Sequence, residues 1–355
     1  MSTKSSLKDR CVAFKEGSPV VIRLDAVSRP MLPEERDILA SIDAEVVEAE
    51  DMDQETVKDH ADRADAVIVT AKSLKAPIIE KLKRCRVISR MGIGTDKIDV
   101  KQASRQGIWV TNLPGFCVEE VADHTMALLL SAARQLKEFE TAMRSGFRPQ
   151  VNPNISIHRL SCCKLGIVGF GHIGKEVARR AKSFNLNILA CDPALTEGVA
   201  KEYGVQKVEL DELLSKSDFV ALVCPLTSQT SGMMNAERFQ MMKKTAILIN
   251  TGRGGLINEA DLVYALKMGI IRFAALDVFD CVDVLGPGRF PTDHPLFQLE
   301  NVLMTPHVAA ISFEMIYEQR RRGTKTVVDV LCGYRPEHLV NPEVIPWFDR
   351  DQSVK

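Results

Sequence analysis

Four segments of the sequence place chemically useful residues directly after short apolar runs that are typical of β-strands. Residues 90–99 (RMGIGTDKID) form a glycine-rich turn, and residues 250–255 (NTGRGG) form a second one that carries Arg253. Asp277 follows the apolar run AAL, and His307 follows VLMTP. An arginine has the fork geometry to bind a carboxylate or polarise a carbonyl, and a histidine can transfer a proton. Open α/β folds gather their ligands at the carboxyl ends of strands, so we expect these residues to share one site.

Each residue taken alone also has an ordinary structural explanation. Arg253 could be a solvated surface arginine, Asp277 could cap the turn that follows it, and His307 could be a satisfied structural histidine. The turn at 90–99 could be an ordinary connection between a strand and a helix. The combination of the four segments, rather than any single one, indicates chemistry.

A fifth segment, residues 164–192 (KLGIVGFGHIGKEVARRAKSFNLNILACD), predicts a dinucleotide site in the middle of the chain. Gly169 allows a tight turn, Gly171 lets the backbone approach a pyrophosphate, and Gly174 lets the helix pack close to the strand. Asp192, 18 residues after Gly174, is placed to accept hydrogen bonds from ribose hydroxyls. No arginine closely follows Asp192, which favours NAD over NADP.

The elements that position these residues alternate in type along the chain. β-like runs at 20–24, 66–70, 86–90 and 108–111 alternate with amphipathic helical stretches at 33–42 and 76–83, which is typical of a parallel sheet covered by helices. Residues 119–136 predict one long apolar helix and 146–157 a loop. After the glycine motif, we expect strands at 218–224, 246–250, 274–278 and 302–304, and helices at 259–268 and 312–332.

Length and composition limit the possible functions. A chain of 355 residues is long for one core, so two domains are expected. A net charge of -1 argues against a nucleic-acid partner. Nine scattered cysteines indicate reduced thiols rather than a disulfide framework or a metal site. The absence of an apolar leader or of a run of ~18 apolar residues predicts a cytoplasmic protein with no membrane contact.

From about residue 66 to about residue 341, the sequence resembles the D-isomer-specific 2-hydroxyacid dehydrogenase family, which includes the C-terminal-binding proteins. The matching stretches are RMGIGTDKID, LPGFCVEEVADHTMALLL, GFGHIG, CPLTSQT, INTGRGGLINEADLVYAL, AALDVF and TPH. The resemblance implies an α/β fold of two Rossmann/flavodoxin-like, doubly wound domains. It places an NAD-binding domain at 118–307, inserted in a discontinuous substrate domain at 1–117 and 308–355. It also implies a cleft that closes on substrate and a homodimer formed through the NAD-binding domain.

The resemblance further implies an NAD-dependent oxidoreductase that interconverts a 2-keto acid and a D-2-hydroxy acid. Arg253 would hold the substrate carboxylate and keto oxygen, and His307 would donate or accept the proton. The substrate carboxylate would also meet the backbone amides of Met91, Gly92, Ile93 and Gly94. The residues expected along the cofactor are Gly169, Gly171, His172, Ile173, Gly174, Asp192, Val223, Cys224, Pro225, Thr230, Thr251, Gly252, Arg253, Asp277 and His307. No metal is implied.

The chain departs from the family pattern at one catalytic position. The family normally has a glutamate five residues after the aspartate of AALDVF, where it contacts the catalytic imidazole, but this chain has Val282. A valine cannot orient the ring, and the loss of a neighbouring anion should lower the pKa of His307. Asp283, one residue later, is the candidate replacement if the following loop turns its side chain. Val282 therefore leaves an alternative open, in which the protein is a dimeric NAD(H)-binding regulator with weak or lost turnover.

Overall fold

The computed structural model describes residues 17–146, 157–282 and 293–346. The chain divides into two compact units. We call Met1–Phe116 with Ser312–Lys355 the terminal unit, because it contains both chain ends, and Cys117–Ile311 the central unit.

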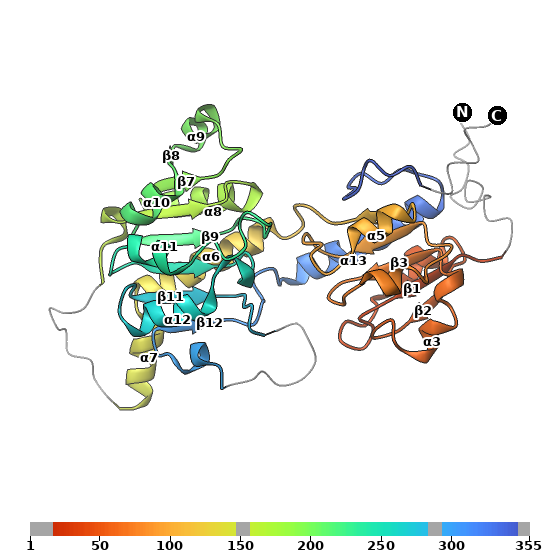
Figure 1. The fold of residues 1–355 in the computed structure, drawn as a ribbon, viewed down its shortest axis with the longest axis horizontal. Helices are drawn as coiled ribbons and strands as arrows, with labels where there is room; N and C mark the ends of the chain where they lie inside the picture. The colour runs from red at the N-terminus through yellow and green to blue at the C-terminus, as the bar shows by residue number, and fades with distance from the viewer. Residues whose placement is uncertain (1–16, 147–156, 283–292, 347–355) are drawn as a thin grey trace. The chain divides into compact units, whose positions relative to one another are not determined.

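The terminal unit contains a parallel five-stranded sheet in the order β2-β1-β3-β4-β5. Its strands are β1 (Val20–Arg23), β2 (Glu45–Glu48), β3 (Ala66–Val69), β4 (Val87–Arg90) and β5 (Trp109–Thr111). Its helices are α2 (Pro33–Ala40), α3 (Glu55–Lys58), η1 (Ala61–Arg63), α4 (Ala76–Ile79), α5 (Val100–Arg105) and α13 (Phe313–Leu331). The last of these, blue in Figure 1, returns the end of the chain to the first strands and packs against α2, β3 and β4.

The central unit contains a parallel seven-stranded sheet in the order β12-β11-β10-β9-β6-β7-β8. Its strands are β6 (Lys164–Val168), β7 (Asn187–Cys191), β8 (Gln206–Lys207), β9 (Phe219–Leu222), β10 (Ile247–Asn250), β11 (Phe273–Leu276) and β12 (Val302–Met304). Its helices are α6 (Val118–Ala133), α7 (Leu136–Arg144), η2 (Leu160–Cys162), α8 (His172–Ser183), α9 (Glu197–Tyr203), α10 (Leu210–Lys216), α11 (Ala236–Met241), η3 (Gly254–Leu256), α12 (Glu259–Lys267) and η4 (Pro295–Gln298).

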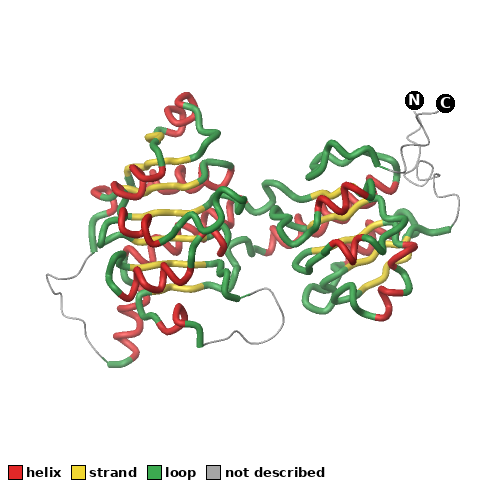
Figure 2. The backbone as a smooth tube through the Cα atoms, in the orientation of Figure 1, coloured by secondary structure: helices red, strands yellow, loops and turns green. Residues whose placement is uncertain are grey.

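The buried side chains explain why both sheets are covered on two faces. β1, β3, β9, β10 and β11 are buried at every residue, as expected for strands with helices on both sides. Figure 2 shows the strands of each sheet side by side, with helices overlapping them in the view. The chain order reverses between β6 and β9, so the carboxyl ends of these strands form the switch point at which doubly wound folds bind ligands.

The structure differs from the sequence-based expectations in a few places. The single helix expected at 119–136 ends at Ala133, because Gln135 adopts a left-handed backbone with φ 54°, and α7 begins at the next residue. The exposed edge strand β2 was not expected from its sequence EVVE. Most of the loop expected at 146–157 lies outside the described residues.

The sequence predicted that the cysteines are reduced thiols, and this holds for most of the described cysteines but not for all. Free thiols are present at Cys85, Cys117, Cys162, Cys163, Cys191, Cys224 and Cys281. The expectation of reduced thiols is wrong for Cys332, which is disulfide-bonded. Among the described helices, none is both long and apolar enough to cross a membrane.

Candidate active site

A tight glycine turn follows β6. Gly169 has φ +96°, and a Cβ there would lie 2.7 Å from the backbone nitrogen of Cys224, so only glycine fits this position. Gly171 is the N-cap of α8 and has no atom within 4 Å of an added Cβ. His172 is exposed and Ile173 is half-buried in the first turn of the helix. The turn therefore leaves space for an anionic group at the N-terminus of α8, where free N–H groups and the helix dipole favour negative charge.

Gly174 and Asp192 hold this turn in place. An added Cβ at Gly174 would collide with the carbonyl oxygen of Gly169, so α8 packs directly against the turn. Asp192 accepts hydrogen bonds from the backbone N–H groups of Phe170 and Ala194, each at 2.7 Å. Its oxygens keep lone pairs for ribose hydroxyls, while its charge opposes a 2′-phosphate. The residues present therefore fit NAD.

The predicted cofactor contacts after β9 lie in one short segment: Val223, Cys224, Pro225 and Thr230. The N–H of Val223 donates to the carbonyl of Val168 at 3.0 Å, which keeps the segment beside β6. The hydroxyl of Thr230 donates to the carbonyl of Pro225 at 2.7 Å. Burial raises the pKa of the Cys224 thiol to about 11, so this residue stays a neutral thiol beside the turn.

The backbone around Arg253 is held by buried polar side chains. Asn250 is fully buried at the end of β10; its amide nitrogen donates to the carbonyl of Arg253 at 2.9 Å, and its oxygen accepts the N–H of Gly252 at 3.0 Å. The hydroxyl of Thr251 is bonded to that of Thr125 from α6 at 2.7 Å. One Arg253 nitrogen, Nη1, donates to the Gly252 carbonyl at 2.8 Å, and the residue is half-buried. These hydrogen bonds fix the base of the loop, which carries the Arg253 guanidinium at the carboxyl end of β10.

Asp277 is fully buried and holds the loop that follows β12. Its Oδ1 accepts the hydroxyl of Thr305 at 2.6 Å and the N–H of Val308 at 2.9 Å, and its Oδ2 accepts the N–H of Ala309 at 2.9 Å. The Nε2 of His124 lies 2.9 Å from the same Thr305 hydroxyl. The carboxylate of Asp277 therefore caps the loop after β12, rather than the turn that directly follows Asp277 in the chain.

His307 lies in that loop with a left-handed backbone, at φ 56°. Its N–H donates to the carbonyl of Asp277 at 2.8 Å and to that of Thr305 at 3.1 Å. A left-handed backbone is uncommon for residues other than glycine, although histidine tolerates it better than most. Such strain persists only where neighbouring bonds enforce it, and it is typical of functional sites.

Backbone hydrogen bonds join the ends of three neighbouring strands. The N–H of Asp277 donates to the carbonyl of Asn250 at 2.9 Å, and the carbonyl of Asp277 accepts from His307. The loops that carry the guanidinium and the imidazole are therefore tied to the same residue. The sequence motifs predict Arg253, Asp277 and His307 as site residues. They do not predict the supporting residues Asn250 and Thr305, whose only signal is their place within the same segments.

The position of the missing glutamate is at the limit of the described chain. Val282 is half-buried, and Asp283, its candidate replacement, lies outside the described residues. The carboxylate of Glu259 accepts the N–H groups of Asp280 at 2.6 Å and Cys281 at 3.0 Å. The backbone just before Val282 is therefore fixed by the first turn of α12.

The turn after β4 in the terminal unit has two amides that are already used. The N–H of Met91 donates to the carbonyl of Val69 at 2.8 Å, and that of Gly92 donates to the carbonyl of Arg90 at 2.9 Å. Among the described residues, no acceptor pairs with the N–H groups of Ile93 and Gly94. These two consecutive amides are the ones that remain available for an anion.

Comparison with known proteins identifies the family. Residues 126–309 match the family model described as the D-isomer specific 2-hydroxyacid dehydrogenase, NAD binding domain. The chain belongs to this family. The expected α/β fold, the NAD cofactor and the oxidoreductase class that interconverts 2-keto and 2-hydroxy acids are thereby confirmed.

Individual relatives show how far the similarity extends. Glyoxylate reductase of Korarchaeum cryptofilum is 39% identical over 82% of this chain and 86% of its own length. D-3-phosphoglycerate dehydrogenase of Methanocaldococcus jannaschii is 38% identical over 82% of this chain but only 54% of its own length. The crystal structure of D-lactate dehydrogenase from Aquifex aeolicus with NAD and lactic acid aligns with a TM-score of 0.80 at 27% identity, covering 88% of this chain and 96% of that chain.

Proposed function

We propose that the protein uses NADH to reduce a small 2-keto acid of the glyoxylate or pyruvate type to the corresponding D-2-hydroxy acid. The observation that carries the proposal is the Asp277 network, which fixes the His307 loop and is bonded to the base of the Arg253 loop. A keto acid needs a cation beside its oxygen and a proton donor on the same side, and these two loops supply both groups. The glyoxylate reductase relative favours small substrates.

The central unit supplies the cofactor site in this proposal. The glycine turn and the N-terminus of α8 would bind the pyrophosphate, and Asp192 would accept the ribose hydroxyls. The segment from Val223 to Thr230 would lie along the remainder of the cofactor. When bound, NADH supplies the hydride. Residues of the chain orient the substrate, stabilise the developing charge and transfer the proton.

Substrate orientation is assigned to three groups. The amides of Ile93 and Gly94 would bind the carboxylate, and Arg253 would contact both the carboxylate and the keto oxygen. Charge that develops on that oxygen is stabilised by the guanidinium until His307 protonates it. In the oxidative direction, neutral His307 accepts the same proton.

An absorbance assay at 340 nm tests this function. NADH should be oxidised when glyoxylate, pyruvate or hydroxypyruvate is added, with kcat/KM on the order of 10⁴ M⁻¹s⁻¹ or higher for the best substrate. Arg105→Gln changes an exposed arginine of α5, and this variant should keep the activity of the wild type. Binding of NADH without oxidation on any 2-keto acid between pH 5 and 9 would rule the proposal out.

Val282 favours a second candidate function, in which cofactor binding regulates association with a partner and turnover is weak.

We propose in either case that the protein is a cytoplasmic homodimer. Seven of the eight described cysteines are free thiols, which favours a reducing compartment, whereas the disulfide at Cys332 argues in the other direction. In α7, no residue is buried, and Leu136 and Met143 are 55% and 65% exposed, which is unusual for apolar side chains unless a partner covers them.

A further inference from the structure

The turn formed by Met91, Gly92, Ile93 and Gly94 has a donor bound to each of its carbonyl oxygens. The Met91 oxygen accepts from Nη1 of Arg90 at 2.6 Å and from Nε2 of Gln319 at 3.0 Å. The Gly92 oxygen accepts the N–H of Leu113 at 2.9 Å. The Ile93 oxygen accepts from Nδ2 of Asn112 at 2.8 Å, and the Gly94 oxygen from Nε of Arg90 at 3.0 Å. We call Arg90, Asn112 and Gln319 the carbonyl clamp.

The clamp has a direct consequence for the amides of the turn. A peptide plane fixes its N–H roughly opposite the preceding C=O, so holding the carbonyls of Gly92 and Ile93 also sets the direction of the N–H groups of Ile93 and Gly94. Consecutive amides whose carbonyls are turned away form a favourable site for an anion. The carbonyl dipoles would otherwise repel a carboxylate.

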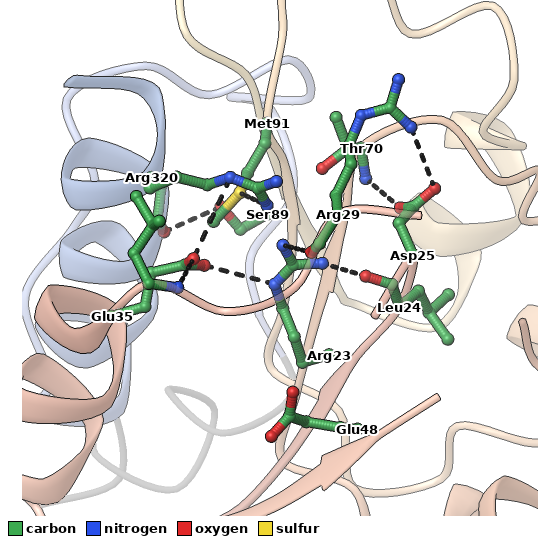
Figure 3. A network of polar contacts seen from close by, with 12 residues as sticks. Arg23, Leu24, Asp25, Arg29, Glu35, Glu48, Thr70, Ser89, Met91 and Arg320 are labelled. Carbon is green, nitrogen blue, oxygen red and sulfur yellow. Dashed lines mark hydrogen bonds and ion pairs between the residues drawn. The ribbon is translucent and has the colours of Figure 1, made fainter. Parts of the chain in front are cut away.

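Helix α13 supports the turn from the buried side. The Met91 side chain is fully buried, and a Cβ at Gly323 would lie 2.8 Å from its Cγ. In Figure 3, Arg320 extends from α13 toward the Met91 sulfur, at 3.7 Å, and toward Glu35, which in turn bonds Arg23 at 3.2 Å. The contact between α13 and the turn is therefore part of a packed core rather than a loose surface contact.

Glycine at position 92 fits the same arrangement. A Cβ on Gly92 would overlap the Arg90 guanidinium, which folds under the turn to reach the carbonyls of Met91 and Gly94. The glycine is thus required by the clamp, in addition to any need for space around a ligand.

We propose that Asn112, Arg90 and Gln319 are positioning residues for the two amides that bind the substrate carboxylate. Asn112 holds the peptide plane that carries the Gly94 N–H. Arg90 and Gln319 hold the planes on either side of the Ile93 and Gly94 amides, through the Met91 and Gly94 carbonyls. This inference rests on the proposed function, in which those amides bind that group. Gln319 comes from the last helix, 228 residues from the carbonyl it holds.

Two near-isosteric variants test the clamp. Asn112→Leu and Gln319→Met remove one donor each without adding charge. The KM for glyoxylate should rise by about fivefold to tenfold in Asn112→Leu, the effect of one lost hydrogen bond on a plane that carries a binding amide. It should rise by a smaller factor, about twofold to fivefold, in Gln319→Met, which frees the adjacent plane. We expect kcat to stay within about twofold. The Kd for NADH should not change, because its proposed site lies in the central unit. Gln102→Met is the matched control, since Gln102 is a glutamine of the same unit that bonds Gln106 rather than the turn.

A binding measurement separates failure of the clamp from failure of the proposed function. Oxamate, an unreactive analogue of a 2-keto acid, is titrated by calorimetry into the NADH complexes of the wild type and both variants. Weaker oxamate binding in the variants supports the clamp even if no 2-keto acid is reduced. Unchanged KM and oxamate affinity, or equal loss in Gln102→Met, overturns it, and so does a wild type that binds no oxamate. If one of the two variants fails to fold, the KM and the oxamate affinity of the other variant test the clamp.

Discussion

Among the individual residues, the buried carboxylate of Asp277 has the central structural role in the candidate site. It is an acceptor for one hydroxyl and two backbone amides, and its own backbone links the loops of Arg253 and His307. A charged group without exposure is tolerated because these hydrogen bonds replace water. Its value to function is that it fixes where His307 lies.

Asp277→Asn tests this role with almost no change in size. An asparagine turns one acceptor into a donor, which then faces an N–H or hydroxyl donor, so the His307 loop should shift. A displacement of about 1 Å predicts a kcat lower by about tenfold to a hundredfold with NADH affinity largely kept. Steady-state kinetics and NADH fluorescence titration measure both. Wild-type kcat in this variant would show that the network does not position the histidine.

Val282→Glu tests whether the valine occupies the place of the family's glutamate. A carboxylate beside His307 would favour the imidazolium and raise the pKa of that ring. The protonated donor would then persist to higher pH, so the rate of keto acid reduction should increase or its pH optimum should move upward. Val282→Gln is the uncharged control. If pH–rate profiles of all three proteins coincide, another group, such as Asp283, already performs the task.

At the element scale, the ends of three strands in the terminal unit are joined by Glu50. This residue follows β2, accepts the N–H groups of Val27 and Ser28 at 2.9 and 3.0 Å, and pairs with Lys72 after β3 at 3.0 Å. Burial by itself would raise the pKa of Glu50, but the hydrogen bonds from Ser28, Lys72 and Val27 outweigh it and lower the pKa to about 2.

The lowered pKa predicts how Glu50 contributes to stability. Because the folded state holds the charged form, the contribution is complete above the ordinary pKa of 4.5 and is lost as the pH falls toward 2. Glu50→Gln should therefore lower the free energy of unfolding at pH 7 by about 1–2 kcal/mol, a figure reduced for partial solvent exposure. Urea denaturation at pH 7 and at pH 3 should show the difference shrinking with acid. An equal difference at both pH values would contradict the assignment.

The sequence predicted helices and strands well where the local pattern of apolar residues indicates a buried element. The buried strands β1, β3, β9 and β10 and the glycine turn at Gly169 lie where the sequence placed them. Short apolar runs between polar stretches are typical of buried strands, and glycine marks the tight turn after β6. The break at Gln135 was not visible, since no glycine or proline marks it. The carbonyl clamp was not predicted either, because Asn112 and Gln319 contact the turn only after the chain has folded.

The candidate site was predictable only in part. Segment motifs located Arg253, Asp277 and His307, but not the hydrogen bonds that use Asp277 as a cap or that occupy the amides of Met91 and Gly92. Those bonds depend on which strand ends become neighbours in the sheet. Sequence spacing alone does not contain that information.

At the scale of the whole molecule, the uncovered apolar side chains of α7 predict self-association. Sedimentation equilibrium should give twice the chain mass of 39.4 kDa. Replacing Leu136 and Met143 together by serine should weaken the dimer, whereas serine at Tyr264, an exposed aromatic of α12, should not. A wild type that remains monomeric at micromolar concentration with NADH present would refute this prediction.

An isotope-transfer experiment tests whether the guanidinium of Arg253 and the imidazole of His307 serve one hydride transfer. NADH that carries deuterium at both C4 positions is mixed with pyruvate, and the product is analysed by mass spectrometry and chiral chromatography. We expect D-lactate with deuterium at C2, and a rate lower by about a hundredfold or more in Arg253→Met and in His307→Gln while NADH still binds. Unlabelled product, L-lactate, or undiminished transfer in either variant would contradict this shared role.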